Sequence, residues 1–188
     1  TGAKYGLADL HDRITQGVLD GTVPKAKAES DFAAEAGKLL QGTGGDLSQE
    51  QRGAVVAELT RDAARLGNSV RKAVTQRDRQ DVTSGISQTL EYLQRQYRAD
   101  PAKATQQAMD LVDQLGPHST LNPEQLAKLK QSWKEGTQYT AGCELVSAGR
   151  ADRKMLDAAE KTISTGLPDI DPQKRATLLD RIAAYRLH

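Results

Sequence analysis

Residues 48–97, SQEQRGAVVAELTRDAARLGNSVRKAVTQRDRQDVTSGISQTLEYLQRQY, decide the fold class of this chain. Ser48 can cap a helix, and Gln51 stands three residues later, as in a capping box. Apolar side chains then recur at the three- and four-residue spacing of one helix face, with one polar gap before Val82: Val55, Leu59, Ala63, Leu66, Val70, Val74, Val82, Ile86, Leu90, Leu93 and Tyr97. No proline interrupts the stretch. It therefore predicts either one helix of roughly 50 residues, about 75 Å long, or two helices with a kink or break near Gly67 or residues 76–81.

Proline and glycine mark further helices on both sides of this stretch. The apolar spacing predicts a helix over about residues 6–19 and a second from Pro24 to about residue 40. Four more helix starts follow: Pro101, Pro123, Asp152 and Pro172. Proline suits a first helical position because the amide hydrogen that it lacks has no partner there. The segments 47–51, 121–125 and 170–174 resemble one another in their capping residues. We attribute this similarity to the capping pattern that helical hairpins commonly share; the alternative explanation is duplication of a helix pair.

The composition is typical of a helical chain and excludes several classes of protein. Of 188 residues, 4% are aromatic, 26 are basic, 25 are acidic and one is cysteine. β-Sandwiches and barrels need more β-branched and aromatic residues. A net charge of +1 gives no global attraction to nucleic acid, and one cysteine excludes a disulfide framework. No apolar run reaches the roughly 18 residues of a membrane span, and we expect no signal peptide.

We therefore predict an all-α fold without a β-sheet, in which about seven helices form stacked α-hairpins around one long central helix. The predicted segments are an N-terminal helical hairpin (1–46), the central helix (47–99) and a C-terminal four-helix region (100–188), within one continuous helical unit. The sequence begins with Thr1 and not with methionine. We expect either a fragment of a longer polypeptide or a trimmed chain.

Residues that could perform catalysis or bind a metal ion are scattered along the chain. The histidines, His11, His118 and His188, lack metal-site spacing, and Cys143 lies in a helical stretch typical of a partly buried thiol. Four glutamates are candidates for a glycan-cleaving acid, although lysines and arginines lie near each of them: Glu35, Glu91, Glu144 and Glu160. The glycines of residues 42–45 precede no lysine and predict a loop, not a phosphate cradle. We predict no catalytic residue, cofactor, metal site or small-molecule ligand.

One window of the sequence is strongly basic. Residues 61–80 contain six basic side chains against two aspartates, an excess of four positive charges: Arg61, Arg65, Arg71, Lys72, Arg77 and Arg79. Such a stripe could contact phosphates of a nucleic acid. No aromatic residue is interleaved to stack on bases, and a solvated face of a long helix is the interpretation that we favour.

Three segments and the run of alanine- and glutamine-rich helices carry a resemblance to a known class of proteins. The segments are ADPAKA (99–104), LNPEQ (121–125) and DIDPQKR (169–175), the last followed by LLDRI (178–182). In these features, over most of residues 6–187, the chain resembles the helical internal virion proteins of tailed bacteriophages. These are ejection or core proteins that can be fused to peptidoglycan hydrolases. The resemblance implies packing in the particle and delivery into the host envelope, and it transfers no catalytic residue.

We thus expect a non-enzymatic structural or assembly segment of a phage or prophage virion protein, internal or tail-associated. It would act by helix–helix contact with copies of itself or with other virion proteins. Its expected location is the virion or the bacterial cytoplasm. The alternatives are a bacterial helical adaptor or secretion-associated protein-binding module, and a peptidoglycan-cleaving, glycosidase-like domain. A hydrolase activity elsewhere in a longer parent protein is compatible with the first expectation.

Overall fold

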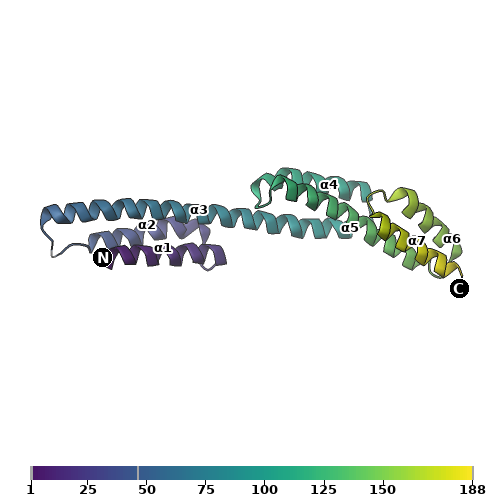
Figure 1. The fold of residues 1–188 in the computed structure, drawn as a ribbon, viewed down its shortest axis with the longest axis horizontal. Coiled ribbons are helices and arrows are strands. Elements are labelled where there is room, and N and C mark those ends of the chain that lie inside the picture. The colour runs from purple at the N-terminus through teal and green to yellow at the C-terminus, as the bar shows by residue number, and fades with distance from the viewer. Residues whose placement is uncertain (1, 46, 188) are drawn as a thin grey trace. The chain divides into compact units, whose positions relative to one another are not determined.

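A computed structural model describes residues 2–45 and 47–187, and in this part of the chain the fold is all-α, as predicted (Figure 1). The α-helices are α1 (Gly2–Asp20), α2 (Lys25–Gln41), α3 (Gln49–Gln96), α4 (Pro101–Leu115), α5 (Pro123–Gly149), α6 (Arg153–Lys161) and α7 (Pro172–Arg186). A 3₁₀ turn, η1 (Gly116–His118), follows α4, and a π-helical turn, η2 (Thr162–Gly166), follows α6. No strand occurs within the described ranges.

The helix α3 extends over 48 residues as one α-helix, without a break at Gly67 or within residues 76–81. Its predicted capping box is confirmed. The Gln51 amide donates to Ser48 Oγ at 3.3 Å, and the Ser48 amide donates to Gln51 Oε1 at 3.2 Å. These two bonds satisfy donors that a helix start otherwise leaves open, which fixes where α3 begins.

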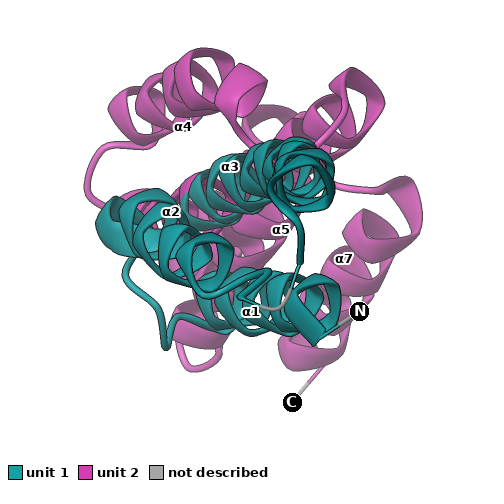
Figure 2. Cartoon of the chain, turned by 90° about the vertical axis from the view of Figure 1, so that its left-hand side faces the viewer, with its two compact units in different colours: residues 1–81 teal, residues 82–188 magenta. Residues whose placement is uncertain are grey.

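The chain divides into two compact units, unit 1 (residues 1–81) and unit 2 (residues 82–188), shown in Figure 2. The division falls inside α3, at the end of the polar stretch 76–81. Since apolar side chains are what bind a helix to its neighbours, the gap in the apolar stripe separates two cores along one helix. The boundaries of the predicted segments 1–46, 47–99 and 100–188 lie between helices, whereas the two units divide within α3.

Unit 1 is a hairpin of α1 and α2 packed on the first part of α3. Its core consists of buried side chains from the three helices, of which Ala73 was not part of the predicted stripe: Leu7, Leu10, Ile14, Val18, Ala28, Phe32, Ala36, Leu59, Val70 and Ala73. Phe32 is 3% exposed, and its ring lies 3.5 Å from the point where a Cβ on Gly67 would stand. Because Gly67 has no side chain, the ring of Phe32, the only phenylalanine of the chain, can pack beside α3 in the core.

Unit 2 contains two neighbouring apolar clusters that share α5. The first joins the end of α3 to α4 and α5: Ile86, Leu90, Leu93, Tyr97, Ala104, Ala108, Val112 and Trp133. The second joins α5 to α6, η2 and α7: Val146, Leu156, Ala159, Ile163, Leu167, Ile170, Leu178 and Ile182. The four C-terminal helices begin where they were predicted to, and the side chains of Asp100, Asn122, Asp152 and Asp171 cap them.

Candidate functional site

The predicted basic stripe lies on α3 in unit 1, and part of it is engaged in contacts within the chain. Arg71 Nε donates to Glu29 Oε2 at 2.9 Å, which joins α3 to α2. Arg65 pairs with Asp62 on its own helix at 3.3 Å. These exposed ion pairs lower the positive charge that the stripe presents to an outside anion.

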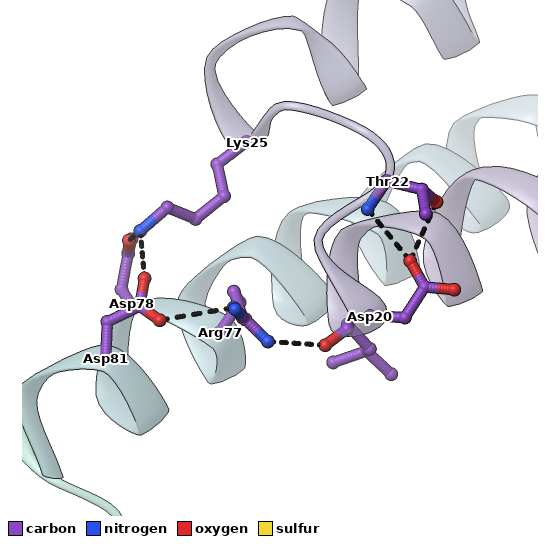
Figure 3. A network of polar contacts seen from close by, with 7 residues as sticks. Asp20, Thr22, Lys25, Arg77, Asp78 and Asp81 are labelled. Carbon is purple, nitrogen blue, oxygen red and sulfur yellow. Dashed lines mark hydrogen bonds and ion pairs between the residues drawn. The ribbon is translucent and has the colours of Figure 1, made fainter. Parts of the chain in front are cut away.

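Arg77 has a structural position at the end of α1 (Figure 3). One guanidinium nitrogen donates to the carbonyl oxygen of Leu19 at 2.7 Å, and Nε lies 3.2 Å from Asp81 Oδ1. The carbonyl groups that end a helix lack intrahelical donors, and a cation there also complements the helix dipole. Arg77 therefore ties α1 to α3 and is not presented to solvent as a free cation.

The same network holds the start of α2. Lys25 Nζ lies 2.5 Å from Asp78 Oδ1 and 2.7 Å from Asp81 Oδ2 (Figure 3). The Asp78 hydrogen bond is the largest cause that raises the pKa of Lys25, followed by the one to Asp81. The hydrogen bond from Lys25 lowers the pKa of Asp81. Of the two aspartates within the basic window, Asp78 thus has its partner on α2, and Asp62 pairs with Arg65 on α3 and with Lys4 on α1.

Three members of the basic stripe remain. Arg61, Lys72 and Arg79 are exposed on α3. In the described part of the chain, Arg61 and Lys72 have no ion-pair or hydrogen-bond partner. The structure therefore does not bring the six residues together as one binding surface, and phosphate binding by this stripe stays a prediction.

A groove in unit 2 was not predicted from the sequence. Its polar part is a cavity of about 500 Å³ between the end of α3 and the middle of α5, lined by Glu91, Gln94, Arg95, Tyr97, Arg98, Thr137, Thr140, Ala141 and Glu144. An adjoining apolar cavity of about 290 Å³ shares four of these residues and reaches η2 through Pro101, Leu145, Ala148, Thr162, Gly166 and Leu167. We call the two cavities together the α3–α5 groove.

The walls of the α3–α5 groove are two helices that run in the same direction. Trp133 Nε1 donates to the Leu90 carbonyl oxygen at 2.9 Å, and further along both helices Arg98 lies 3.9 Å from Glu144. On α5 the lining residues repeat every three or four positions from Thr137 to Ala148, which is a length of about 16 Å. The groove is therefore as long as a helix of about three turns.

Two features of the α3–α5 groove are typical of binding sites. Thr137 is 2% exposed, and its hydroxyl has no hydrogen-bond partner among the residues that the structure describes. Such hydroxyls are uncommon in folded proteins, and Thr15 Oγ1 on α1 is another example, outside the groove. The apolar cavity also abuts the π-helical turn η2, and π-turns are frequent at functional sites.

Buried polar contacts hold the groove in shape. Gln138 Nε2 donates to Asp169 Oδ2 at 2.8 Å, and its Oε1 accepts from the Asp169 amide at 2.8 Å. This pair fixes the loop before α7 on α5. Burial, followed by the charge of Asp169, raises the pKa of Tyr97, which stands edge-on to Trp133 at a ring distance of 6.4 Å. Tyr97 therefore remains a neutral wall between the two cavities.

The glutamates considered as catalytic acids lie in different environments. Glu91 and Glu144 both line the α3–α5 groove. Glu35 lies 2.5 Å from Arg13 in unit 1, and Glu160 lies 2.6 Å from Arg186 in unit 2. The Glu144 side chain is 51% exposed and faces Arg98. The four glutamates therefore do not share one site, and of them Glu144 also borders the apolar cavity.

The other candidates for chemistry are dispersed. Cys143 is half-buried against the second cluster of unit 2. His11 Nδ1 lies 2.8 Å from Asp12 on α1, His118 is exposed in η1, and His188 lies outside the described residues. In residues 2–45 and 47–187, no three side chains of the types that bind metals are grouped, and no helix is long and apolar enough to cross a membrane.

Comparisons of the chain with protein-family models, with curated proteins and with solved structures gave no match.

Proposed function

We propose that this chain is a non-enzymatic helical assembly segment of a phage or prophage virion protein, and that it binds a partner helix in the α3–α5 groove. The observation that carries this proposal is the groove itself. Two parallel helices leave a trough about three turns long, and a third amphipathic helix is the element that fits such a trough.

The lining of the groove agrees with a helical partner. Ala141 and Ala148 form its α5 wall with small side chains, which lets another backbone approach closely. Leu145 is 36% exposed beside the apolar cavity, where it can meet a large side chain of the partner. This combination of a small-residue floor, one apolar pocket and a polar rim is that of a protein interface.

The virion assignment draws on the resemblance of residues 99–104, 121–125 and 169–175 to internal virion proteins. It is tested with purified particles of the phage that encodes the chain. Quantitative mass spectrometry of these particles should detect the chain in a fixed ratio to the capsid protein. Its absence from the particles would refute the assignment and favour the adaptor interpretation, which uses the same groove.

The role of the groove is tested in the same particles by the substitution Ala148→Arg. Ala148 is exposed, so a long charged side chain there fills the apolar cavity without disturbing a core. We expect Ala148→Arg to deplete the chain from particles severalfold. The matched control is Ala127→Arg, an exposed alanine on α5 that is not part of the groove. Equal incorporation of the two variants would show that the groove binds nothing in the particle.

A second candidate is a peptidoglycan-cleaving domain, which one observation favours. Glu91 and Glu144 line the same groove, as the two carboxylates of a glycosidase would. Zymography with the purified chain separates the two functions. The assembly function predicts no clearing of peptidoglycan. Clearing that is lost in Glu91→Gln or Glu144→Gln would establish the enzyme instead.

A further inference from the structure

The α3 rim of the groove carries opposite charges that form no ion pair within the described residues. Glu91 and Arg95 are both exposed, and within residues 2–45 and 47–187 neither has an ion-pair or hydrogen-bond partner. Four residues apart, they lie about 40° from one another around the helix and about 6 Å along it. The rim therefore presents a negative and a positive charge on one line.

We infer that the occupant of the groove is a second copy of this chain, docked antiparallel with its own α3 rim against the first. This inference rests on the proposed function of the groove and names its partner. In a two-fold contact, residue i of one copy meets residue j of the other, and j meets i. A two-fold axis level with Leu93 places Glu91 of each copy opposite Arg95 of the other. Two ion pairs then form at once.

Charge complementarity selects this orientation over the alternatives. A parallel arrangement would set Glu91 against Glu91 and Arg95 against Arg95, which is repulsive. In the antiparallel arrangement the next opposed residues are Gln88 and Arg98, so a neutral acceptor meets a cation. The Arg98 side chain is 83% exposed and so can be reached, although it also lies 3.9 Å from Glu144 of its own chain.

An apolar contact accompanies these charges. Tyr92 is 57% exposed, and on the helix it stands about 60° beyond Arg95. When α3 of the second copy lies along the rim of the first, Tyr92 of the first copy stands beside the contact, on the side that faces away from the groove of that copy. An aromatic side chain contributes strongly to binding where the contact buries it, whereas exposed ion pairs contribute little and chiefly determine orientation.

The experiment exchanges charges at two positions and then mixes the products. Glu91→Arg gives a rim with two positive charges, and Arg95→Glu gives a rim with two negative charges. Each variant alone turns two attractions of the antiparallel contact into two repulsions. We expect each to self-associate about tenfold more weakly than the wild type, because an exposed pair changes an equilibrium constant only a few-fold. Sedimentation velocity of the full chain at low salt measures this.

The equimolar mixture of the two variants distinguishes this contact from an effect within one helix. Opposite rims attract, so the mixture should associate at least as strongly as the wild type. The matched control exchanges Glu124 and Lys128, a pair with the same spacing on α5, 2.8 Å apart and outside the groove. Glu124→Lys and Lys128→Glu should leave self-association unchanged, alone and mixed.

Three results would overturn self-docking. They are a wild-type chain that stays monomeric at all concentrations, a mixture that associates no better than its components, and a control pair that behaves like the rim pair. If the chain is monomeric but Ala148→Arg still depletes it from particles, the groove binds a helix of another protein and the proposed function stands. If Ala148→Arg has no effect either, both proposals fall.

Discussion

Replacing Phe32 by alanine tests whether the two units unfold separately. Phe32 is 3% exposed and packs against Gly67 in the core of unit 1. Removing a buried phenylalanine ring costs about 3–5 kcal/mol, because apolar contacts are lost and a cavity remains. A unit of 81 residues has a free energy of unfolding of roughly 4–12 kcal/mol at ~0.05–0.15 kcal/mol per residue. The substitution therefore removes a quarter or more of the stability of unit 1.

The chain contains a built-in probe for the other unit. Trp133 is its single tryptophan, 7% exposed in the first cluster of unit 2. Urea unfolding is followed by circular dichroism, which reports helices of both units, and by tryptophan fluorescence, which reports unit 2. In Phe32→Ala the dichroism should show an early transition, and the fluorescence midpoint should match that of the wild type. An exposed alanine of α2, replaced in Ala34→Ser, serves as the control.

The reasoning is refuted if the fluorescence midpoint of Phe32→Ala moves by the same amount as the dichroism midpoint. The two clusters would then unfold as one cooperative unit, and α3 would transmit the loss across the polar stretch 76–81. It is also refuted if Ala34→Ser lowers stability as much as Phe32→Ala. In that case the position of α2, and not the burial of the ring, would determine the cost.

Three further predictions concern charge, packing and nucleic acid. Hydrogen bonding to Lys25 lowers the pKa of Asp81, so its stabilisation of unit 1 is present above the ordinary aspartate pKa of about 3.9 and is lost as the pH falls through the folded pKa. Acid titration of Asp81→Asn by circular dichroism should therefore show a flatter loss of stability than the wild type. Gly142→Val should destabilise unit 2 by about 1–3 kcal/mol in urea, since even a Cβ at Gly142 would stand 2.7 Å from Leu178 Cδ1; an unchanged midpoint would contradict the packing. If the basic stripe binds DNA, replacing Arg61 and Lys72 by glutamine should reduce salt-dependent retention on DNA, and unchanged retention would exclude these two as phosphate contacts.

The helices of this chain were predictable because their signals are local. A helix start depends on a capping side chain within a few residues, and Ser48, Asn122 and Asp171 were recognised for this reason. The apolar period similarly predicted the faces of α1, α2 and α3. The continuity of α3 was left open, because glycine at position 67 weakens a helix by up to ~1 kcal/mol and packing decides whether that matters. In the structure Phe32 occupies the space beside Gly67, and the helix continues.

The candidate site was much less predictable. The six basic residues of α3 were visible in the sequence, but their partners were not, since Glu29 and the Leu19 carbonyl lie on other helices. The α3–α5 groove left one signal in the sequence, the small residues 137, 141 and 148 at helical spacing on α5. That spacing equally fits a face that is covered by α7, so it could not identify an open groove.

The sequence by itself thus determined the fold class, the helix starts and the apolar faces, because each depends on residues a few positions apart on one helix. Only the tertiary structure decided which charges are neutralised, which hydroxyls are buried without a partner and which helix face stays open. These properties depend on residues such as Leu90 and Trp133, 43 positions apart, that meet only when separate helices pack.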